Sequence, residues 1–125
     1  MRRRFSKQGW LKVYNQKGQM LMWNKIILEF QKNPRDVCTC PTRGNGVWFY
    51  VWVEAGNLYV SRSKACTPSS KTKGKRWLNP SECEPMLELY KRRCRGESVS
   101  QEATALTRNQ VYWYGIFYEM KNLYK

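Results

Sequence analysis

The sequence predicts an α+β fold, in which a small antiparallel sheet is followed by three helices that pack on one of its faces. Strand-forming residues dominate the first half of the chain, with hairpins expected near 10–23 and 47–62. Helix start and stop signals dominate the second half, with helices expected near 80–95, 99–106 and 108–122. Strands followed by helices, without regular alternation of the two, are typical of the α+β class.

The chain of 125 residues is predicted to form a single domain, 1–125, with a flexible basic N-terminal arm at 1–8 and a basic loop at 62–76. Aromatic residues make up 14% of the sequence, which is too rich for a disordered basic tail. The longest apolar run is Val47–Val53, far short of the ~20 residues of a membrane span, so no membrane partner is expected. No apolar segment follows the basic start, and an intracellular location, cytoplasmic or nucleoid-associated, is expected.

The first predicted hairpin, at 10–23, has two apolar-rich segments around the polar turn at 15–18. The next segment, 24–30, fits either a strand, because of its branched aliphatic residues, or a short helix capped by Asn24. Residues 31–46 contain two prolines and two glycines and are predicted to be turn and loop.

The second hairpin, at 47–62, begins with a run of β-branched and aromatic residues, and its predicted two-residue turn is Gly56-Asn57. That turn would pair Val53 with Val60. Alternation along both strands predicts a core face made of Phe49, Val51, Val53, Leu58 and Val60. The opposite face is predicted to carry Trp48, Tyr50, Trp52, Tyr59 and Ser61.

The helical half opens with Asn79-Pro80, a cap followed by a proline at the first helical position, and Gly96 is expected to end that helix. Two capping-box patterns, at 98–101 and 107–110, predict the starts of the next two helices. The last helix is apolar on nearly every side, so we expect it to be packed on several faces.

The positive charge is concentrated in the first part of the chain. Residues 1–76 contain 16 lysines and arginines against 3 acidic residues, which gives +13 of the total net charge of +14. Such a charge excess is typical of proteins that bind a polyanion. The aromatic residues predicted on the outer face of the hairpin at 47–62 could stack on nucleic-acid bases. The sequence therefore predicts a nucleic-acid-binding protein, for DNA or RNA. The predicted binding residues are Arg2, Arg3, Arg4, Trp48, Tyr50, Trp52, Tyr59, Arg62, Lys64, Lys71, Lys73, Lys75 and Arg76.

Alternatives remain open at this point. The sheet could be covered on both faces, which would bury the aromatics in a core, and the arginine arm could be a plain disordered end. Exposed aromatics would favour single strands, whereas buried ones would favour duplex or backbone-only binding. The last two helices also fit a helix-turn-helix, with Arg108, Asn109 and Gln110 placed to read bases. The rival functions are an adaptor for an acidic protein partner and a nucleic-acid-processing enzyme of a mobile element or phage.

Catalytic and metal-binding signals are weak. The sequence has no histidine, which excludes nucleophile systems of the Ser–His and Cys–His types. Five cysteines with irregular spacing do not form a disulfide framework, and Cys38 and Cys40 are too close for a usual zinc pair. Cys83 and Cys94 are predicted to be buried free thiols. We expect no cofactor and no metal, and the balance favours a binding protein over an enzyme.

Overall fold

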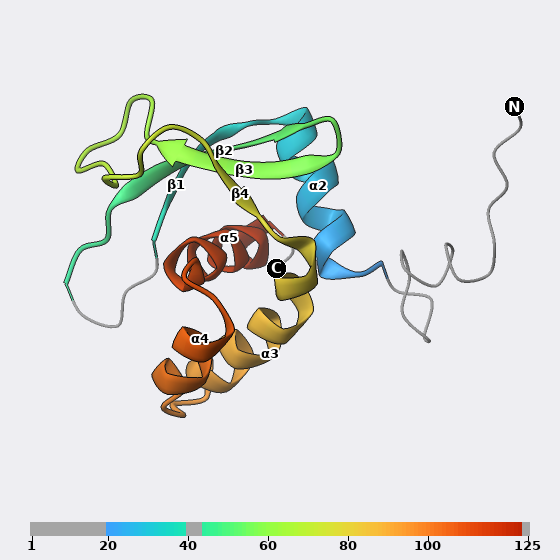
Figure 1. Cartoon of the computed structure of the whole chain (residues 1–125), viewed down its shortest axis with the longest axis vertical. Helices are drawn as coiled ribbons and strands as arrows, with labels where there is room; N and C mark the ends of the chain where they lie inside the picture. Colours follow the sequence, from blue (N-terminus) through green and yellow to red (C-terminus); the bar gives the residue numbers. More distant parts are fainter. Residues whose placement is uncertain (1–19, 40–43, 124–125) are drawn as a thin grey trace, which may run out of the picture.

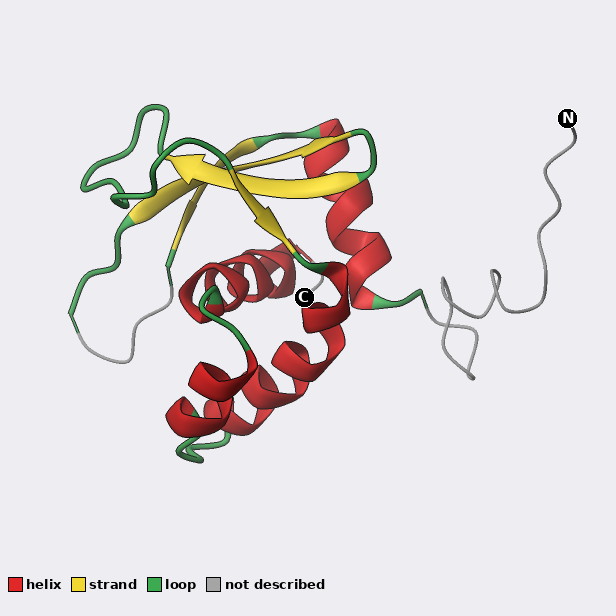
Figure 2. Ribbon diagram, viewed as in Figure 1, coloured by secondary structure: helices red, strands yellow, loops and turns green. Residues whose placement is uncertain are grey.

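The computed structural model describes residues 20–39 and 44–123, and it has the predicted α+β fold. In Figure 1 and Figure 2 the sheet lies above most of the helices, and one helix rises beside its right-hand end. The sheet is antiparallel with strand order β1-β2-β3-β4, and the strands are β1 (Arg35–Cys38), β2 (Trp48–Glu54), β3 (Asn57–Arg62) and β4 (Arg76–Leu78). The helices are α2 (Met22–Lys32), the short 3-10 helix η1 (Pro80–Glu82), α3 (Cys83–Cys94), α4 (Ser100–Leu106) and α5 (Gln110–Leu123).

The core lies between one face of the sheet and the helices. Helix α5 is buried along most of its length and contacts β1 and α3, as its apolar sequence predicts. It approaches the sheet closely at Gly115, where an added Cβ would lie 2.8 Å from the carbonyl oxygen of Cys38. The strand residues that are fully or almost fully buried all lie on this one face: Val37, Phe49, Val51, Leu58, Val60 and Leu78.

The predicted hairpin at 10–23 is wrong in its second half. Residues 10–19 lie outside the described residues, but Met22 and Trp23 begin helix α2. Apolar residues at helical spacing explain the difference, since Ile26 and Phe30 are four apart and both are completely buried. The predicted loop at 31–46 is also wrong in part, because it contains strand β1. This strand is short and is stabilised by pairing with β2, which local sequence does not reveal.

The hairpin at 47–62 is confirmed, but its predicted register is wrong. The turn is Ala55-Gly56, both with positive φ (52° and 77°), and Val53 pairs with Leu58 instead of Val60. The pairing is therefore shifted by two residues. Because side chains alternate with a period of two, this shift leaves every side chain on its predicted face.

The three predicted helices are present with small changes at their ends. The Asn79 side chain caps the first one by accepting a hydrogen bond from the Ser81 N–H, at 3.0 Å. The predicted capping box at 98–101 is wrong, because α4 begins after Val99 without a side-chain cap. The cysteine prediction holds for Cys83, which is a buried free thiol, and is wrong for the burial of Cys94, which is exposed.

Two sets of partly buried polar contacts connect different elements of the fold. Arg35 at the start of β1 lies between Glu29 of α2 and Glu119 of α5, with ion pairs of 2.8 and 2.9 Å. Glu82 accepts hydrogen bonds from the Thr107 hydroxyl and the Trp113 indole N–H. Among the described helices, none is long and apolar enough to cross a membrane.

Candidate functional site

The sheet face that points away from the helices carries a row of aromatic side chains. Trp52 of β2 lies opposite Tyr59 of β3, and Tyr59 lies opposite Trp77 of β4. Tyr50 precedes Trp52 by two residues in β2 and therefore lies on the same face. We call these four residues the aromatic face. All are at least partly exposed, and Trp77 is 48% exposed. Within the described ranges the helices leave this face uncovered (Figure 1), so the alternative of a sheet buried on both faces does not hold there.

Three rings of the aromatic face lie in a row, with Trp52 stacked on Tyr59 and Tyr50 tilted against Trp52, and a lysine lies at each end of the row. The ring centroids of Tyr50 and Trp52 are 5.7 Å apart, and those of Trp52 and Tyr59 are also 5.7 Å apart, with planes 27° from parallel in the second pair. The Lys64 ammonium lies 4.9 Å from the centroid of Tyr50, and the Lys75 ammonium lies 4.6 Å from that of Tyr59. Each arrangement has cation–π geometry, so positive charge is held next to flat apolar surface.

Trp77 is the fourth member of the aromatic face. Among the described residues no ring–ring contact of Trp77 is seen, and 48% of its surface is exposed. The sequence-based prediction did not include it, because β4 is only three residues long and follows a basic, Ser-rich segment. Its position directly after Lys75 and Arg76 is the signal that was available.

Lys75 also interacts with an acidic side chain, that of Glu54. Its ammonium forms an ion pair of 3.0 Å with Glu54, and Glu54 accepts a second hydrogen bond from the Trp52 indole N–H. The hydrogen bond from Trp52, followed by the contact with Lys75, lowers the pKa of Glu54. The hydrogen bond to Glu54 raises the pKa of Lys75, which therefore stays protonated beside Tyr59.

Asp36 fastens the start of the loop between β3 and β4. Its carboxylate accepts three backbone N–H hydrogen bonds, from Lys64, Ala65 and Cys66, at 2.8, 2.9 and 3.0 Å. Partial burial acts to raise the pKa of this carboxyl, but the three N–H groups together outweigh it, so the pKa lies below its ordinary value of 3.8. These three hydrogen bonds hold the backbone of Lys64 beside the aromatic face. From the sequence, Asp36 is expected in a loop, and no local pattern indicates a role for it.

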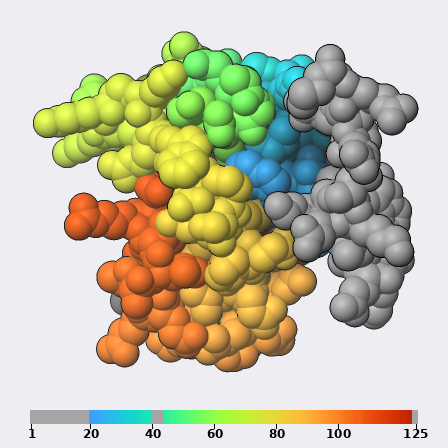
Figure 3. All heavy atoms as spheres, turned by 45° about the vertical axis from the view of Figure 1, so that its right-hand side comes forward, coloured from blue at the N-terminus to red at the C-terminus, as the bar shows by residue number. Residues whose placement is uncertain are grey.

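The end of the same loop is held by hydroxyl groups. Ser70 and Thr72 are buried and hydrogen-bond to each other at 3.0 Å, and Thr72 also bonds to the Tyr112 hydroxyl of α5. Lys71 and Lys73 alternate with these buried residues and are exposed. The loop stands out from the body of the molecule (Figures 1 and 3), so its lysines are accessible from outside.

The structure does not bring all the predicted binding residues together. Arg62 lies opposite Phe49, and Arg76 lies opposite Val60, so both arginines leave the sheet on its helix side. Arg62 donates to the carbonyl of Thr72, and Arg76 donates to the side chain of Asn109. Trp48 is on the same side of the sheet as the aromatic face, but at the other end of β2, beside Ser69. Arg2, Arg3 and Arg4 lie outside the described residues.

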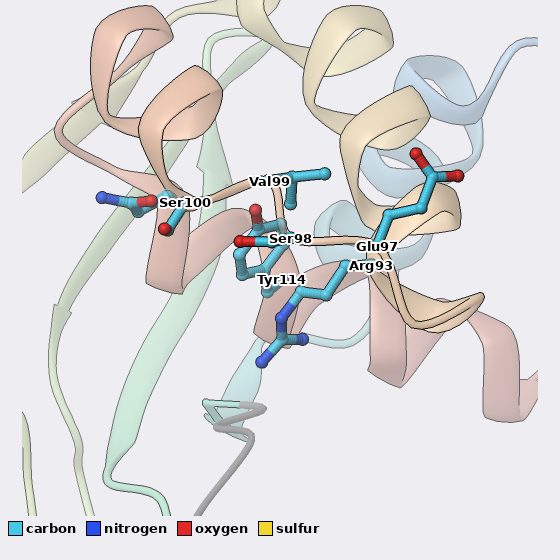
Figure 4. A pocket seen from close by; sticks show the side chains of 7 residues that line it. Arg93, Glu97, Ser98, Val99, Ser100 and Tyr114 are labelled. Atoms are coloured by element: carbon cyan, nitrogen blue, oxygen red, sulfur yellow. The ribbon is translucent and has the colours of Figure 1, made fainter.

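A pocket of about 300 Å³ adjoins the aromatic face where the end of α2 meets β2. A second pocket, of about 280 Å³, lies at the junction of α3, α4 and α5. Figure 4 shows Arg93, Ser98, Ser100 and Tyr114 around it, with Glu97 turned away. The Tyr114 hydroxyl is buried without a hydrogen-bond partner among the described residues, and burial raises its pKa.

The chemistry available on the aromatic face is stacking and charge pairing. Flat rings can pack against planar groups, and the exposed ammonium groups around them can neutralise phosphates. In the ranges 20–39 and 44–123 no three acidic or cysteine side chains gather where they could hold a metal ion. Helix α5 is a core helix with seven buried residues, which argues against its use as an exposed recognition helix.

Comparison with known proteins adds no family: no family model, no curated protein and no solved structure matches this chain.

Proposed function

We propose that this protein binds nucleic acid through the aromatic face and the basic loop beside it. The observation that carries the proposal is the row of rings formed by Tyr50, Trp52 and Tyr59, which the described helices leave uncovered and which has Lys64 at one end and Lys75 at the other. Stacked rings beside fixed cations match the alternation of bases and phosphates in a nucleic-acid chain. The net charge of +14 supports a polyanionic partner for the whole molecule.

The exposed lysines of the loop provide the test of phosphate binding. The double variant Lys71→Ala/Lys73→Ala removes two charges from a segment whose neighbours Ser70 and Thr72 remain buried. We expect weaker binding to all sequences, and a slope of log affinity against log salt that is less steep by about 1.5, because two phosphate contacts are lost. Titration of a labelled oligonucleotide at several salt concentrations measures both quantities.

The matched control is Lys91→Ala/Lys121→Ala, which removes the same charge from exposed positions on α3 and α5. An equal loss in the control would mean that net charge alone drives binding, and it would contradict the proposed surface. Trp77→Ala tests stacking in the same titration, with Tyr118→Ala as its control, because these side chains are 48% and 47% exposed.

An acidic protein is the alternative partner for the same surface. Such a partner offers carboxylates without bases, so its binding would depend on the lysines and would be insensitive to Trp77→Ala. Failure of the parent protein to bind any nucleic acid at low salt, together with binding to an acidic protein, would replace the proposal with this alternative.

A further inference from the structure

We infer that the pocket beside the aromatic face binds one unpaired nucleobase, which makes single strands the preferred ligand. This inference rests on the proposed function and specifies its ligand. The pocket of about 300 Å³ is lined by Phe30, Gln31 and Pro34, by Tyr50, Trp52 and Val53 of β2, and by Lys64.

The pocket coincides with an open edge of strand β2. Pairing between β1 and β2 ends at Arg35, which lies opposite Val51. Continuing the register would place Pro34 opposite Trp52 and Asn33 opposite Val53. Proline has no N–H group, and the Asn33 N–H already bonds to the carbonyl of Glu29 at the end of α2. The strand β1 therefore stops two residues short of Val53.

The backbone of Val53 points to this open edge. Along an antiparallel strand, the N–H and C=O groups of successive residues face opposite neighbours. Val47 bonds to Thr39 on the β1 side, whereas Trp48 bonds to Pro68 and Ser70 on the other side. Odd-numbered residues of β2 thus face β1, so both backbone polar groups of Val53 face the pocket. Over the described ranges, neither group has a strand partner.

A nucleobase fits this combination of groups. The N–H and C=O of Val53 form an adjacent donor and acceptor, which is the pattern that the Watson–Crick edge of a base requires. Gln31 also lines the pocket, and its carboxamide has a further donor and acceptor. The base would lie against the side chains of Trp52 and Tyr50, and the Lys64 ammonium is near enough to Tyr50 (4.9 Å) to meet the adjoining phosphate.

Only an unpaired base can use these groups. In a duplex the Watson–Crick edges are occupied by the complementary strand, and the bases are stacked inside the helix. A single strand can turn one base out of its stack at lower cost. The pocket therefore distinguishes single strands from duplexes, whereas the lysines of the basic loop would contact the phosphates of both.

The test uses the full chain and three probes of equal length: a single-stranded oligodeoxynucleotide, a duplex, and a strand of abasic sugar–phosphates. Val53→Pro removes the outward N–H but leaves intact the β2–β3 hydrogen bonds, which use the neighbouring residues. Val53→Thr, of nearly equal shape and with its N–H retained, is the matched control. Gln31→Ala removes the carboxamide, and Gln101→Ala on exposed α4 is its control.

We expect Val53→Pro and Gln31→Ala each to weaken binding of the single strand about five-fold or more. Their affinity for the duplex and the abasic strand should stay within error of the parent, as should all affinities of the two controls. Equal weakening for all three probes, or none, would overturn the inference. If Val53→Pro lost its cooperative thermal unfolding, Gln31→Ala and the parent's preference for the base-containing strand would decide.

Failure of this inference can be separated from failure of the proposed function. Equal affinity of the parent for all three probes, with a salt slope that still depends on Lys71 and Lys73, would leave nucleic-acid binding intact and remove the base pocket. No binding of any probe at low salt would remove both. A β-strand-forming peptide that binds in place of nucleic acid, and is lost in Val53→Pro, would identify strand addition and also overturn the inference.

Discussion

At the scale of single residues, two buried or half-buried oxygen atoms differ in how they are satisfied. The Asp36 carboxylate accepts three backbone hydrogen bonds and organises the start of a long loop. The Tyr114 hydroxyl lies in the interior without a partner among the described residues. An unsatisfied buried polar group costs free energy, whereas a well-bonded carboxylate contributes it. Removing the polar atoms of these two residues should therefore have opposite effects on the free energy of unfolding.

For Asp36, we expect a pH-dependent contribution to stability. Its pKa in the folded protein is below the ordinary 3.8, so the contribution is complete above that value and is lost as the pH falls through the lower, folded pKa. Asp36→Asn should lower the free energy of unfolding at neutral pH by about 1–3 kcal/mol. Urea denaturation at neutral pH and near pH 3 should show the difference between parent and variant shrinking in acid. If the difference in the free energy of unfolding did not depend on pH, the charge of Asp36 would not be needed for these hydrogen bonds, and the prediction would be wrong.

For Tyr114, we expect removal of the polar atom to leave the stability unchanged or to raise it. Tyr114→Phe removes only the hydroxyl oxygen and keeps the ring that packs beside Tyr90 at 5.9 Å. The variant should be as stable as the parent or more stable by up to about 1 kcal/mol, because an unsatisfied polar atom is removed. Thermal unfolding followed by circular dichroism gives the comparison. A clear loss of stability would show that the hydroxyl is bonded after all.

At the scale of elements, close approach of α5 to the sheet sets the position of β1. The Gly115 backbone lies against the Cys38 carbonyl and the Phe49 ring, where an added Cβ would meet atoms at 2.8 and 3.0 Å. Because Cys38 and Phe49 belong to the paired strands β1 and β2, neither can move without shifting its neighbours. The glycine is thus required by packing and not by its backbone conformation.

Gly115→Ala should therefore destabilise the protein, although alanine is the better helix former. Helix propensity alone predicts a gain of about 1 kcal/mol, whereas overpacking at a rigid contact costs about 1–3 kcal/mol. We expect a net loss, seen as a lower midpoint in guanidinium denaturation. A raised midpoint would mean that α5 and β1 separate easily, and that the contact is less rigid than the distances indicate.

How much could be predicted from sequence also differs between elements. The hairpin at 47–62 and the three C-terminal helices carry strong local signals, and each was found. The turn was misplaced because Ala55 adopts a left-handed conformation that favours Gly or Asn, so the sequence pointed to Gly56-Asn57. Strands β1 and β4 have four and three residues, and they are stabilised by pairing across the sheet and by burial of Val37 and Leu78, which are long-range interactions. The aromatic face was predicted in part, and Trp77 was missed together with its strand.

At the scale of the whole molecule, the concentration of positive charge opposes folding. Twenty-three basic residues face nine acidic ones, and most of the excess lies in the first 76 residues. The ion pairs of Arg92 with Glu97 and Glu102 lie outside residues 1–76, so they do not neutralise charge where most of the excess is found.

We therefore expect added salt to stabilise the free protein. Raising the ionic strength from about 0.01 to 0.15 M shortens the screening length from about 30 to 8 Å, which weakens the repulsion between the cationic side chains. The melting temperature should rise over this range. Sodium chloride and sodium fluoride should act alike, because screening depends on ionic strength. A melting temperature that falls with salt would show that attractive ion pairs outweigh the repulsion.

The hydrogen bonds that hold the two ends of the loop between β3 and β4 affect the expected association rate with a ligand. Asp36 holds one end of the loop, and the hydroxyls of Ser70, Thr72 and Tyr112 hold the other. Binding that requires a conformational change has a lower association rate constant, whereas a segment already in its bound conformation leaves only diffusion and orientation. An anionic chain that reaches this surface would therefore meet ammonium groups at set positions. Its capture would proceed at rates governed by long-range attraction.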